Sequence, residues 1–230
     1  MRDPNRELLE AAVRLLHPLL DDLVFLGGCT TGLFLTDPAA AGLRPTKDVD
    51  AITEVASYGE YATVLSERLR TLGLTEDTSE GAPLCRWRHG TQIIDVMATT
   101  VDVLGFANRW YKPALASSQW MRIADLQVRV IAPIYFLATK LEAFRARGGG
   151  DVSGSHDLED VVTVIDGRPE IVGEVHAAPA DVRTYLGSEF QQLLNARAFV
   201  DALPGFLLPD AANQARISML LDRLAAVASP

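Results

Sequence analysis

The sequence predicts an α+β protein in which strands and helices alternate to about residue 131 and helices alone follow. Short apolar or alternating runs, typical of strands, lie between turn residues in the first part of the chain. After Ala132-Pro133, apolar residues recur at helical spacing. The length of 230 residues allows a core domain and a smaller one. We therefore expect two domains, residues 1–131 and 132–230.

The first part is predicted to begin with a helix capped by Asp3-Pro4, because proline suits the first turn of a helix. Glycine at position 73 is expected to end a later helix. The expected elements are a helix with its apolar face from Leu8 to Leu20, a strand at Leu23–Leu26, a helical turn at Thr30–Leu35, a strand at Lys47–Thr53, a helix at Tyr58–Leu72, a hairpin of Leu84–Arg88 and Gln92–Met97, and a strand at Leu126–Ile131.

The second part is predicted to hold four helices, at about residues 133–147, 156–165, 180–202 and 211–228. A flexible glycine-rich connection, Arg147–Asp151, separates the first two. The apolar faces of these helices indicate a helical core, although a partner protein could also cover one of them.

Composition excludes several classes of protein. The chain is 48% hydrophobic and 22% charged, as in an ordinary globular protein. No apolar run approaches the roughly 18 residues of a membrane helix, and the charged segment Met1–Glu7 is unlike a secretory signal. With only Cys29 and Cys85, a disulfide framework is not expected, which favours a reduced, cytoplasmic setting without a membrane.

The net charge of −9 is unevenly distributed. Residues 1–80 carry −7, residues 81–147 carry +5 and residues 148–230 carry −7. The total argues against a protein that coats nucleic acid through bulk positive charge. The basic stretch at 81–147 is either a solvated surface or a path that leads an RNA end or a triphosphate toward Asp95 and Lys140.

Three aspartates form the first candidate site. In a strand, Asp48 and Asp50 share one face and Val49 takes the other. Close carboxylates repel unless a cation lies between them, and Mg²⁺ prefers such oxygen ligands. The alternative is that the two aspartates are simply exposed side chains of a surface strand. Asp95 interrupts the apolar strand Gln92–Met97, where a lone carboxylate is costly unless it is paired or metal-bound. It could complete a two-metal site or act as a general base.

A glycine turn forms the second candidate site. A strand that ends in Gly27-Gly28 and opens into a helix leaves backbone N–H groups free to face phosphate oxygens. Without a side chain, Gly28 would let a triphosphate approach the backbone closely. An ordinary tight turn would have the same sequence. The chain has neither a GxGxxG fingerprint nor a P-loop, which disfavours dinucleotide binding and Walker-type ATP hydrolysis.

Lysine is rare, and two of the three lysines, Lys47 and Lys140, are candidate phosphate contacts. Lys47 directly precedes the aspartate pair, and Lys140 shares a helical stripe with Phe144 and Arg147. The ammonium group of Lys140 could neutralise the β- and γ-phosphates of a nucleotide. The same helical spacing is equally consistent with an ordinary surface lysine.

The order of the motifs is more specific than any one of them. It runs Gly27-Gly28-Cys29, Thr46-Lys-Asp-Val-Asp50, Ile94-Asp95-Val96, Lys140–Arg147 and His156-Asp157-Leu-Glu-Asp160. This order resembles the DNA polymerase β-like nucleotidyltransferase superfamily, and within it the AbiEii/AbiGii-type toxin nucleotidyltransferases of bacterial abortive-infection and type IV toxin–antitoxin systems. The resemblance covers about residues 20–168.

The resemblance implies a small mixed sheet with flanking helices, two Mg²⁺ ions, and transfer of a nucleoside monophosphate from an NTP to an acceptor. Asp48, Asp50 and Asp95 would be the catalytic metal ligands. The implied nucleotide-binding residues are Gly27, Gly28, Cys29, Thr30, Lys47 and Lys140, and the accessory residues are Arg147, His156, Asp157 and Asp160. Several such toxins modify tRNA, so tRNA is the expected acceptor and an antitoxin an expected partner.

Two departures from the family pattern keep other functions open. Cys29 stands where relatives usually have serine. Because a thiol is a poorer hydrogen-bond donor to phosphate than a hydroxyl, Thr30 or Thr31 would donate in its place. His156 stands where many toxins have arginine, and His156-Asp157 also fits the start of a helix. The alternatives are a nucleotidyltransferase that acts on a small molecule such as an antibiotic, or a non-catalytic relative that binds a nucleotide or a partner.

Overall fold

The computed structural model describes residues 3–40 and 42–230; Met1, Arg2 and Ala41 lie outside the described residues. The fold is α+β, with a mixed seven-stranded sheet, flanking helices and a helical C-terminal part. Two compact units can be distinguished. We call Pro4–Thr30 with Pro45–Ala132 the sheet unit, and Thr31–Arg44 with Pro133–Pro230, together with Asp3, the helical unit.

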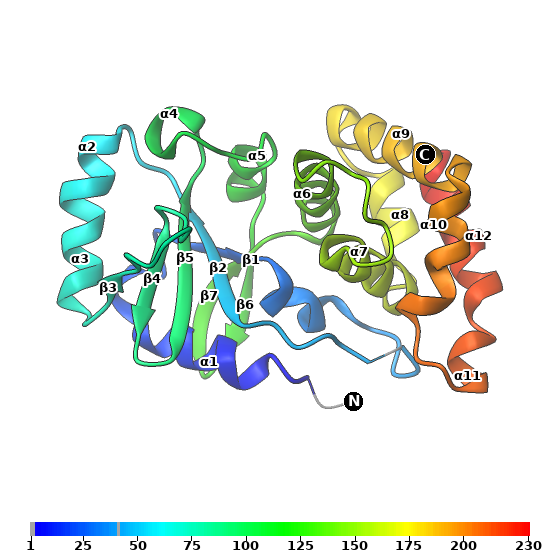
Figure 1. Cartoon of the computed structure of the whole chain (residues 1–230), viewed down its shortest axis with the longest axis horizontal. Coiled ribbons are helices and arrows are strands. Elements are labelled where there is room, and N and C mark those ends of the chain that lie inside the picture. The colour runs from blue at the N-terminus through cyan, green and yellow to red at the C-terminus, as the bar shows by residue number, and fades with distance from the viewer. Residues whose placement is uncertain (1–2, 41) are drawn as a thin grey trace. The chain divides into compact units, whose positions relative to one another are not determined.

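The sheet lies entirely in the sheet unit (Figure 1). Its strands are β1 (Val24–Leu26), β2 (Asp48–Thr53), β3 (Thr75–Glu76), β4 (Arg86–His89), β5 (Gln92–Ala98), β6 (Gln119–Ile123) and β7 (Leu126–Val130). Their order is β3-β4-β5-β2-β1-β7-β6. β2 is parallel to β5 and β1 is parallel to β7, whereas the other neighbours are antiparallel. The central strands are therefore β5, β2 and β1, which carry the predicted site.

Short helices accompany the sheet. They are α1 (Arg6–Leu15), η1 (His17–Leu19), the 3-10 helix η2 (Gly28–Phe34), α2 (Tyr58–Glu60), the π-helical η3 (Tyr61–Leu65), α3 (Ser66–Thr71), α4 (Val101–Leu104) and α5 (Tyr111–Ala116). Helix α1 buries Leu9, Ala12 and Val13 and contacts β2, β5 and β7. Its N-cap residue is Asn5 rather than the predicted Asp3, and Asn5 makes no side-chain cap hydrogen bond because its amide bonds to Gly28 and Thr46 instead.

Several elements of this unit differ from the sequence prediction. The expected helix at 58–72 is continuous but changes its winding at η3, and Gly73 ends it with φ +82°. The helical turn expected at 30–35 is the 3-10 helix η2. β3, β6, α4 and α5 were not predicted. Strand β6 is an exposed edge strand without an apolar alternation, and it forms because a turn at Ala124-Asp125, both with positive φ, folds it onto β7.

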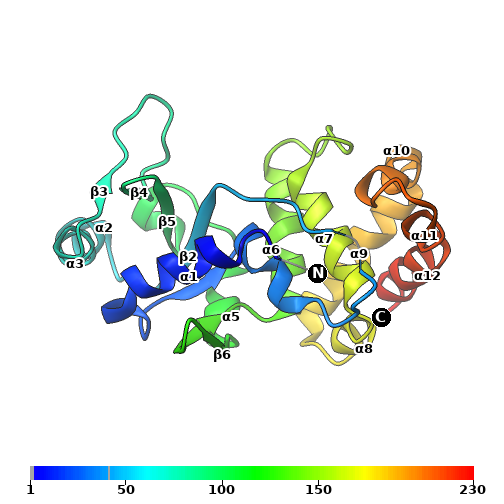
Figure 2. The same cartoon turned by 90° about the horizontal axis from the view of Figure 1, so that it is seen from below.

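The helical unit is a bundle (Figures 1 and 2). Its helices are α6 (Pro133–Ala146), α7 (His156–Gly167), α8 (Ile171–His176), α9 (Ala180–Asn195), α10 (Arg197–Ala202), η4 (Leu203–Phe206), α11 (Ala211–Gln214) and α12 (Ile217–Ala228). The helix predicted at 180–202 is broken where Ala196 adopts an extended conformation, and the one at 211–228 is broken between α11 and α12. The core is apolar, with Phe136, Val161 and Leu224 fully buried.

No helix within residues 3–40 and 42–230 is both long enough and apolar enough to cross a membrane.

A buried arginine joins three segments of the helical unit. Arg216 Nε lies 2.9 Å from Asp166 Oδ1, and Arg216 Nη2 lies 2.7 Å from Asp37 Oδ2. The Asp166 side chain is only 1% exposed. The hydrogen bond from Arg216 lowers the pKa of Asp37, so this carboxylate stabilises the unit at neutral pH. The network connects residues 31–44 to α7 and to the start of α12.

Replacing Arg216 should destabilise the protein. Arg216→Ala leaves Asp166 charged, buried and unpaired, which should lower the free energy of unfolding by about 3 kcal/mol. Urea denaturation measures this difference. Arg197→Ala is the matched control, because the Arg197 side chain is 92% exposed and pairs with exposed Asp201 on the same helix. Equal stability of the two variants would contradict a structural role for Arg216. The deficit should shrink in acid, as the pH falls through the lowered pKa of Asp37.

Candidate active site

The three predicted aspartates lie on one face of two neighbouring strands. β2 and β5 pair in parallel with Asp50 directly opposite Asp95, and Asp48 precedes Asp50 by two positions. Residues opposite each other in a sheet, and residues two apart in a strand, point to the same face. The opposite face carries Val49 and Ile94, which are fully buried. The alternation predicted for β2 is therefore present, and its register brings the third carboxylate to the pair.

Arg86 is the counter-ion of this carboxylate cluster. It begins β4 and lies opposite Asp95 in the antiparallel β4–β5 ladder. Its Nε donates to Asp95 Oδ1 at 2.8 Å and its Nη2 donates to Asp95 Oδ2 at 2.7 Å, which is a two-point ion pair. The same Nη2 lies 3.3 Å from Asp48 Oδ2. Because the Asp95 side chain is only 9% exposed, this pairing compensates the cost of burying its charge.

The charges of the cluster affect neighbouring groups. Hydrogen bonding to Asp95, together with the charges of Asp95 and Asp48, raises the pKa of Arg86 above its ordinary value, so the guanidinium stays protonated. Burial, with smaller contributions from Asp95 and Asp50, raises the pKa of the Cys85 thiol to about 12. Cys85 is therefore a neutral, buried thiol rather than a nucleophile.

A buried asparagine connects the glycine turn to the aspartate strand. Asn5 is 1% exposed, and its Nδ2 donates to the Gly28 carbonyl at 3.4 Å. Its Oδ1 accepts from the Thr46 backbone N–H at 2.8 Å, and the Thr46 hydroxyl donates to Asp48 Oδ1 at 3.0 Å. One side chain thus fixes the turn after β1 and the entry into β2, which orients Asp48.

Gly27 is the glycine that the geometry of the turn requires. Its φ is +77°, and a Cβ added there would overlap the Asp50 carboxylate. The turn after β1 can therefore lie against Asp50 only if residue 27 has no side chain. The sequence predicts the close approach at Gly28, whereas in the structure it occurs at Gly27.

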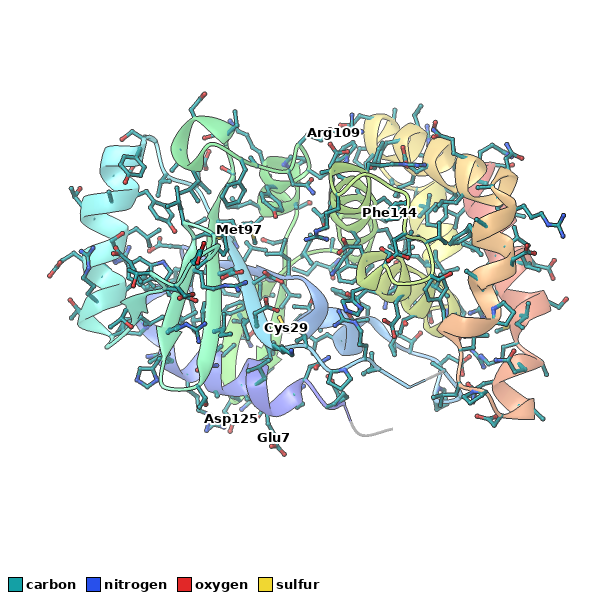
Figure 3. The ribbon with its side chains drawn as sticks, viewed as in Figure 1. Glu7, Cys29, Met97, Arg109, Asp125 and Phe144 are labelled. Carbon is teal, nitrogen blue, oxygen red and sulfur yellow. The ribbon has the colours of Figure 1, made fainter. Side chains whose placement is uncertain are left out.

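The polar side chains of the turn bond within it. The Cys29 thiol is buried and donates to the Leu26 carbonyl at 3.2 Å (Figure 3). The Thr30 hydroxyl is buried and donates to the Gly27 carbonyl at 2.9 Å. In these positions the two side chains stabilise the turn. Thr31 Oγ1 is buried and has no hydrogen-bond partner within the described part of the chain.

The lysines and the accessory residues divide between the two units. Lys47 is exposed and precedes β2 in the sheet unit. Lys140 belongs to the helical unit, where its Nζ lies 2.7 Å from Asp160 Oδ2 and 3.2 Å from Asp157 Oδ1. Asp157 also pairs with Arg147.

The remaining accessory residue, His156, is largely exposed at the start of α7. Arg44, which the sequence reasoning did not single out, lies 3.3 Å from Asp160 through its Nη2. Lys140, Arg147, Asp157 and Asp160, all predicted from sequence, thus form one ion-pair cluster.

The donor set of the carboxylate cluster fits a hard divalent cation. Asp48, Asp50 and Asp95 supply oxygen ligands on one face of the sheet, and Asp50 lies against Gly27, which has no side chain. In the structure, however, Arg86 engages both oxygens of Asp95, and no three metal-ligating side chains among the described residues converge on one point. Binding of a metal would therefore require Arg86 to release at least one of its carboxylate partners.

Arg86 and Asn5 were missed by the sequence reasoning. Arg86 lies in the predicted hairpin of Leu84–Arg88 and Gln92–Met97, but its pairing with Asp95 depends on the register, which the structure sets by pairing His89 with Gln92. Asn5 carried no comparable signal, since it is distant in sequence from both of its partners.

The basic stretch at 81–147 does not form one feature. Arg86 and Arg88 belong to the sheet unit, where they pair with Asp95 and Asp77. Arg145 belongs to the helical unit and pairs with Glu189. Members of the stretch are distributed over two units and are paired with local carboxylates. The net charge of +5 in residues 81–147 is therefore no evidence for a path that leads RNA to the site.

Gly27→Ala should distort the site. The substitution strains a positive φ and forces a methyl group onto Asp50. Gly81→Ala is the matched control, since Gly81 has φ +79° and open space where its Cβ would be. We expect Gly27→Ala to lower the free energy of unfolding by at least about 1 kcal/mol more than the control does, from overpacking alone. Chemical denaturation of both variants measures the difference, and equal losses would show that the turn does not press on Asp50.

Arg86→Leu should leave Asp95 without its partner. Because Arg86 is 24% exposed, we expect the free energy of unfolding to fall by about 2 kcal/mol, which is less than for a fully buried ion pair. Adding Asp95→Asn should recover part of this loss, since the uncompensated charge is removed. The control Arg122→Leu breaks an exposed pair with Asp125 and should change stability by at most about 0.5 kcal/mol. Strictly additive effects of the substitutions at 86 and 95 would exclude the coupling.

Comparison with known proteins gives a distant structural similarity. No family model matches the chain, and no curated protein matches its sequence. Among solved structures, it is similar to an antigenic nucleotidyltransferase-like protein from Paracoccidioides brasiliensis, with 17% sequence identity and a TM-score of 0.49. The similarity covers 92% of this chain and 96% of that protein.

Proposed function

We propose that the chain is a Mg²⁺-dependent nucleotidyltransferase that transfers a nucleoside monophosphate from an NTP to an acceptor hydroxyl. One observation carries the proposal: Asp48, Asp50 and Asp95 share one face of β2 and β5 beside the turn at Gly27. Three carboxylates on one face are costly unless they bind cations. Hard oxygen ligands beside a turn open to phosphate suit a nucleotide bound with magnesium.

In the proposed reaction the acceptor oxygen forms a bond to the α-phosphorus of the NTP, and the bond from that phosphorus to the bridging oxygen breaks. Pyrophosphate leaves, and the proton of the acceptor hydroxyl is taken up by a base or by water. Asp48, Asp50 and Asp95 would hold two Mg²⁺ ions, which would neutralise the triphosphate and acidify the attacking hydroxyl. Asn5 and Thr46 would keep Asp48 aligned for this task.

The proposed triphosphate contacts are the groups that the sequence resemblance implies. The backbone amides that follow Gly27 would face its oxygens, and exposed Lys47 would add a positive charge beside Asp48. Lys140 is the proposed contact in the helical unit, and its ion pairs with Asp157 and Asp160 would hold the ammonium in place for this role. Arg147 and His156 are proposed as accessory residues.

The proposed acceptor is RNA, most specifically tRNA, and the proposed biological role is that of a toxin paired with an antitoxin protein. Both are what the resemblance to the toxin nucleotidyltransferases implies. A small-molecule acceptor such as an antibiotic would use the same carboxylates and the same turn, so the acceptor is decided by assay.

A non-catalytic function is the second candidate, and one observation favours it. Arg86 pairs with both Asp95 and Asp48, and such an ion pair can stabilise the sheet without taking part in a reaction. A protein that binds a nucleotide or a partner could retain the cluster for this reason alone.

Substitution of the aspartates tests the proposed function. The protein is incubated with Mg²⁺, each radiolabelled NTP and total tRNA, and in parallel with a panel of aminoglycosides as small acceptors. We expect label on tRNA with one or more NTPs. Asp48→Asn and Asp95→Asn should each lower transfer at least about 100-fold, because each removes a charge that holds the metal.

The control is Asp125→Asn, at the exposed turn between β6 and β7 (Figure 3), which should transfer at the wild-type rate. Circular dichroism should show that all three variants are folded. Label on an aminoglycoside instead of tRNA would replace the proposed acceptor. The absence of label from every acceptor, or full activity of both aspartate variants, would reject the proposed function.

A further inference from the structure

The edge strand β6 has one side that pairs with no other strand of the described residues. It is the last strand in the order of the sheet and lies at the margin of the sheet unit (Figure 2). Proteins protect such edges with proline, a bulge, several charges or a covering helix, because an unprotected edge pairs with another chain. β6 has five residues, Gln-Trp-Met-Arg-Ile, with no proline, no bulge against β7 and one charge. This edge is therefore open to a further strand.

The register of the hairpin shows which backbone groups of β6 point outward. In a two-residue hairpin the residues that flank the turn exchange hydrogen bonds, and bonded and non-bonded pairs then alternate. The turn is Ala124-Asp125, so Ile123 and Met121 bond to β7. The N–H and C=O groups of Trp120 and Arg122 therefore point to the open side. No backbone group elsewhere in the described part of the chain bonds to them.

The side chains of these two residues are exposed in the chain as a whole. Trp120 is 57% exposed, whereas Trp87 and Trp110 are 1% and 6% exposed. The Arg122 side chain is 70% exposed, and its surface ion pair with Asp125 costs little to open. Because Trp120 and Arg122 are two residues apart in a strand, the indole and the guanidinium lie on the same face of the sheet.

We propose that β6 pairs with β6 of a second copy of this chain, antiparallel and about a two-fold axis at Met121; this inference is independent of the proposed reaction. In this register Trp120 of each copy lies opposite Arg122 of the other, and their outward groups form four backbone hydrogen bonds. Each guanidinium would lie beside an indole, which is a favourable cation–π contact. A register centred on Arg122 would instead place two like charges opposite each other.

The size of this contact determines its strength. A strand of five residues provides a small interface, and interfaces below roughly 1,000 Å² are weak or transient. Each copy carries a net charge of −9, so the two copies also repel, and salt screens that repulsion. We therefore expect a dimer that forms as the protein concentration rises, dissociates on dilution and strengthens with added salt.

Sedimentation of the full chain over a range of concentrations tests the association. Trp120→Pro removes the indole and one outward N–H but no hydrogen bond to β7, and proline is tolerated at such an edge position. It should raise the dissociation constant of the dimer at least about tenfold, because each copy loses a hydrogen bond and a cation–π contact.

The matched control is Tyr58→Ala, since Tyr58 is an aromatic residue of 58% exposure on α2, outside β6. This variant should dimerise as the wild type does, and circular dichroism should show that both variants are folded. A wild-type chain that stays monomeric at every concentration, including one whose β6 pairs with a strand of a different protein instead, would overturn the inference. Equal weakening of the dimer by both substitutions would overturn it as well.

A cysteine on the two-fold axis tests the register. Met121→Cys would lie opposite its own counterpart in a non-hydrogen-bonded pair, with about 4.5 Å between the Cα atoms, which is within the range of a disulfide. Mild oxidation should therefore yield a covalent dimer. Asp125→Cys, at the exposed turn, should not cross-link, and the native Cys29 and Cys85 are buried. Equal cross-linking of the two variants, or none by Met121→Cys in a chain that dimerises, would overturn the proposed pairing.

Discussion

The parallel pairing of β2 with β5 is the constraint on which the candidate site depends. These strands adjoin near the middle of the sheet, and their register places Asp50 opposite Asp95. A shift of β2 by one residue would turn its carboxylates to the face occupied by Val49 and Ile94, where no side-chain surface is exposed to water. Apolar burial on one face of the sheet thus fixes the position of the charges on the other.

The gathering of carboxylates has an electrostatic cost that the chain offsets locally. Arg86 neutralises Asp95 with two hydrogen bonds and reaches Asp48 as well, and Thr46 satisfies a further oxygen of Asp48. Charge-assisted, two-point pairs of this kind hold both partners in a fixed geometry. A cation bound by these carboxylates would therefore compete with the guanidinium of Arg86 for Asp95 and Asp48.

Much of the fold could be predicted from local patterns. The central strands, the helix at 58–72 and the helices beginning at 133 and 156 are marked by apolar or alternating runs between turn residues, and they form close to their expected bounds. The patterns failed where pairing or packing decides the conformation. β6 has exposed side chains and exists because it pairs with β7, while the long helix expected at 180–202 is interrupted at Ala196, where nothing in the apolar period marks a stop.

The sequence by itself determined which residues carry the charge and which strands they occupy, because a period of two assigns Asp48 and Asp50 to one face and an apolar strand isolates Asp95. The resemblance singled out Lys140 as a nucleotide contact and Arg147, Asp157 and Asp160 as accessory residues, and the structure shows that these residues form one ion-pair cluster. Only the tertiary structure decided that Arg86 lies between the carboxylates, that Asn5 bridges Gly28 to Thr46, and that Gly27 is the residue that must lack a side chain. The physical reason is that these roles arise from contacts between strands and turns distant in sequence, whose closeness depends on the order and register of the whole sheet.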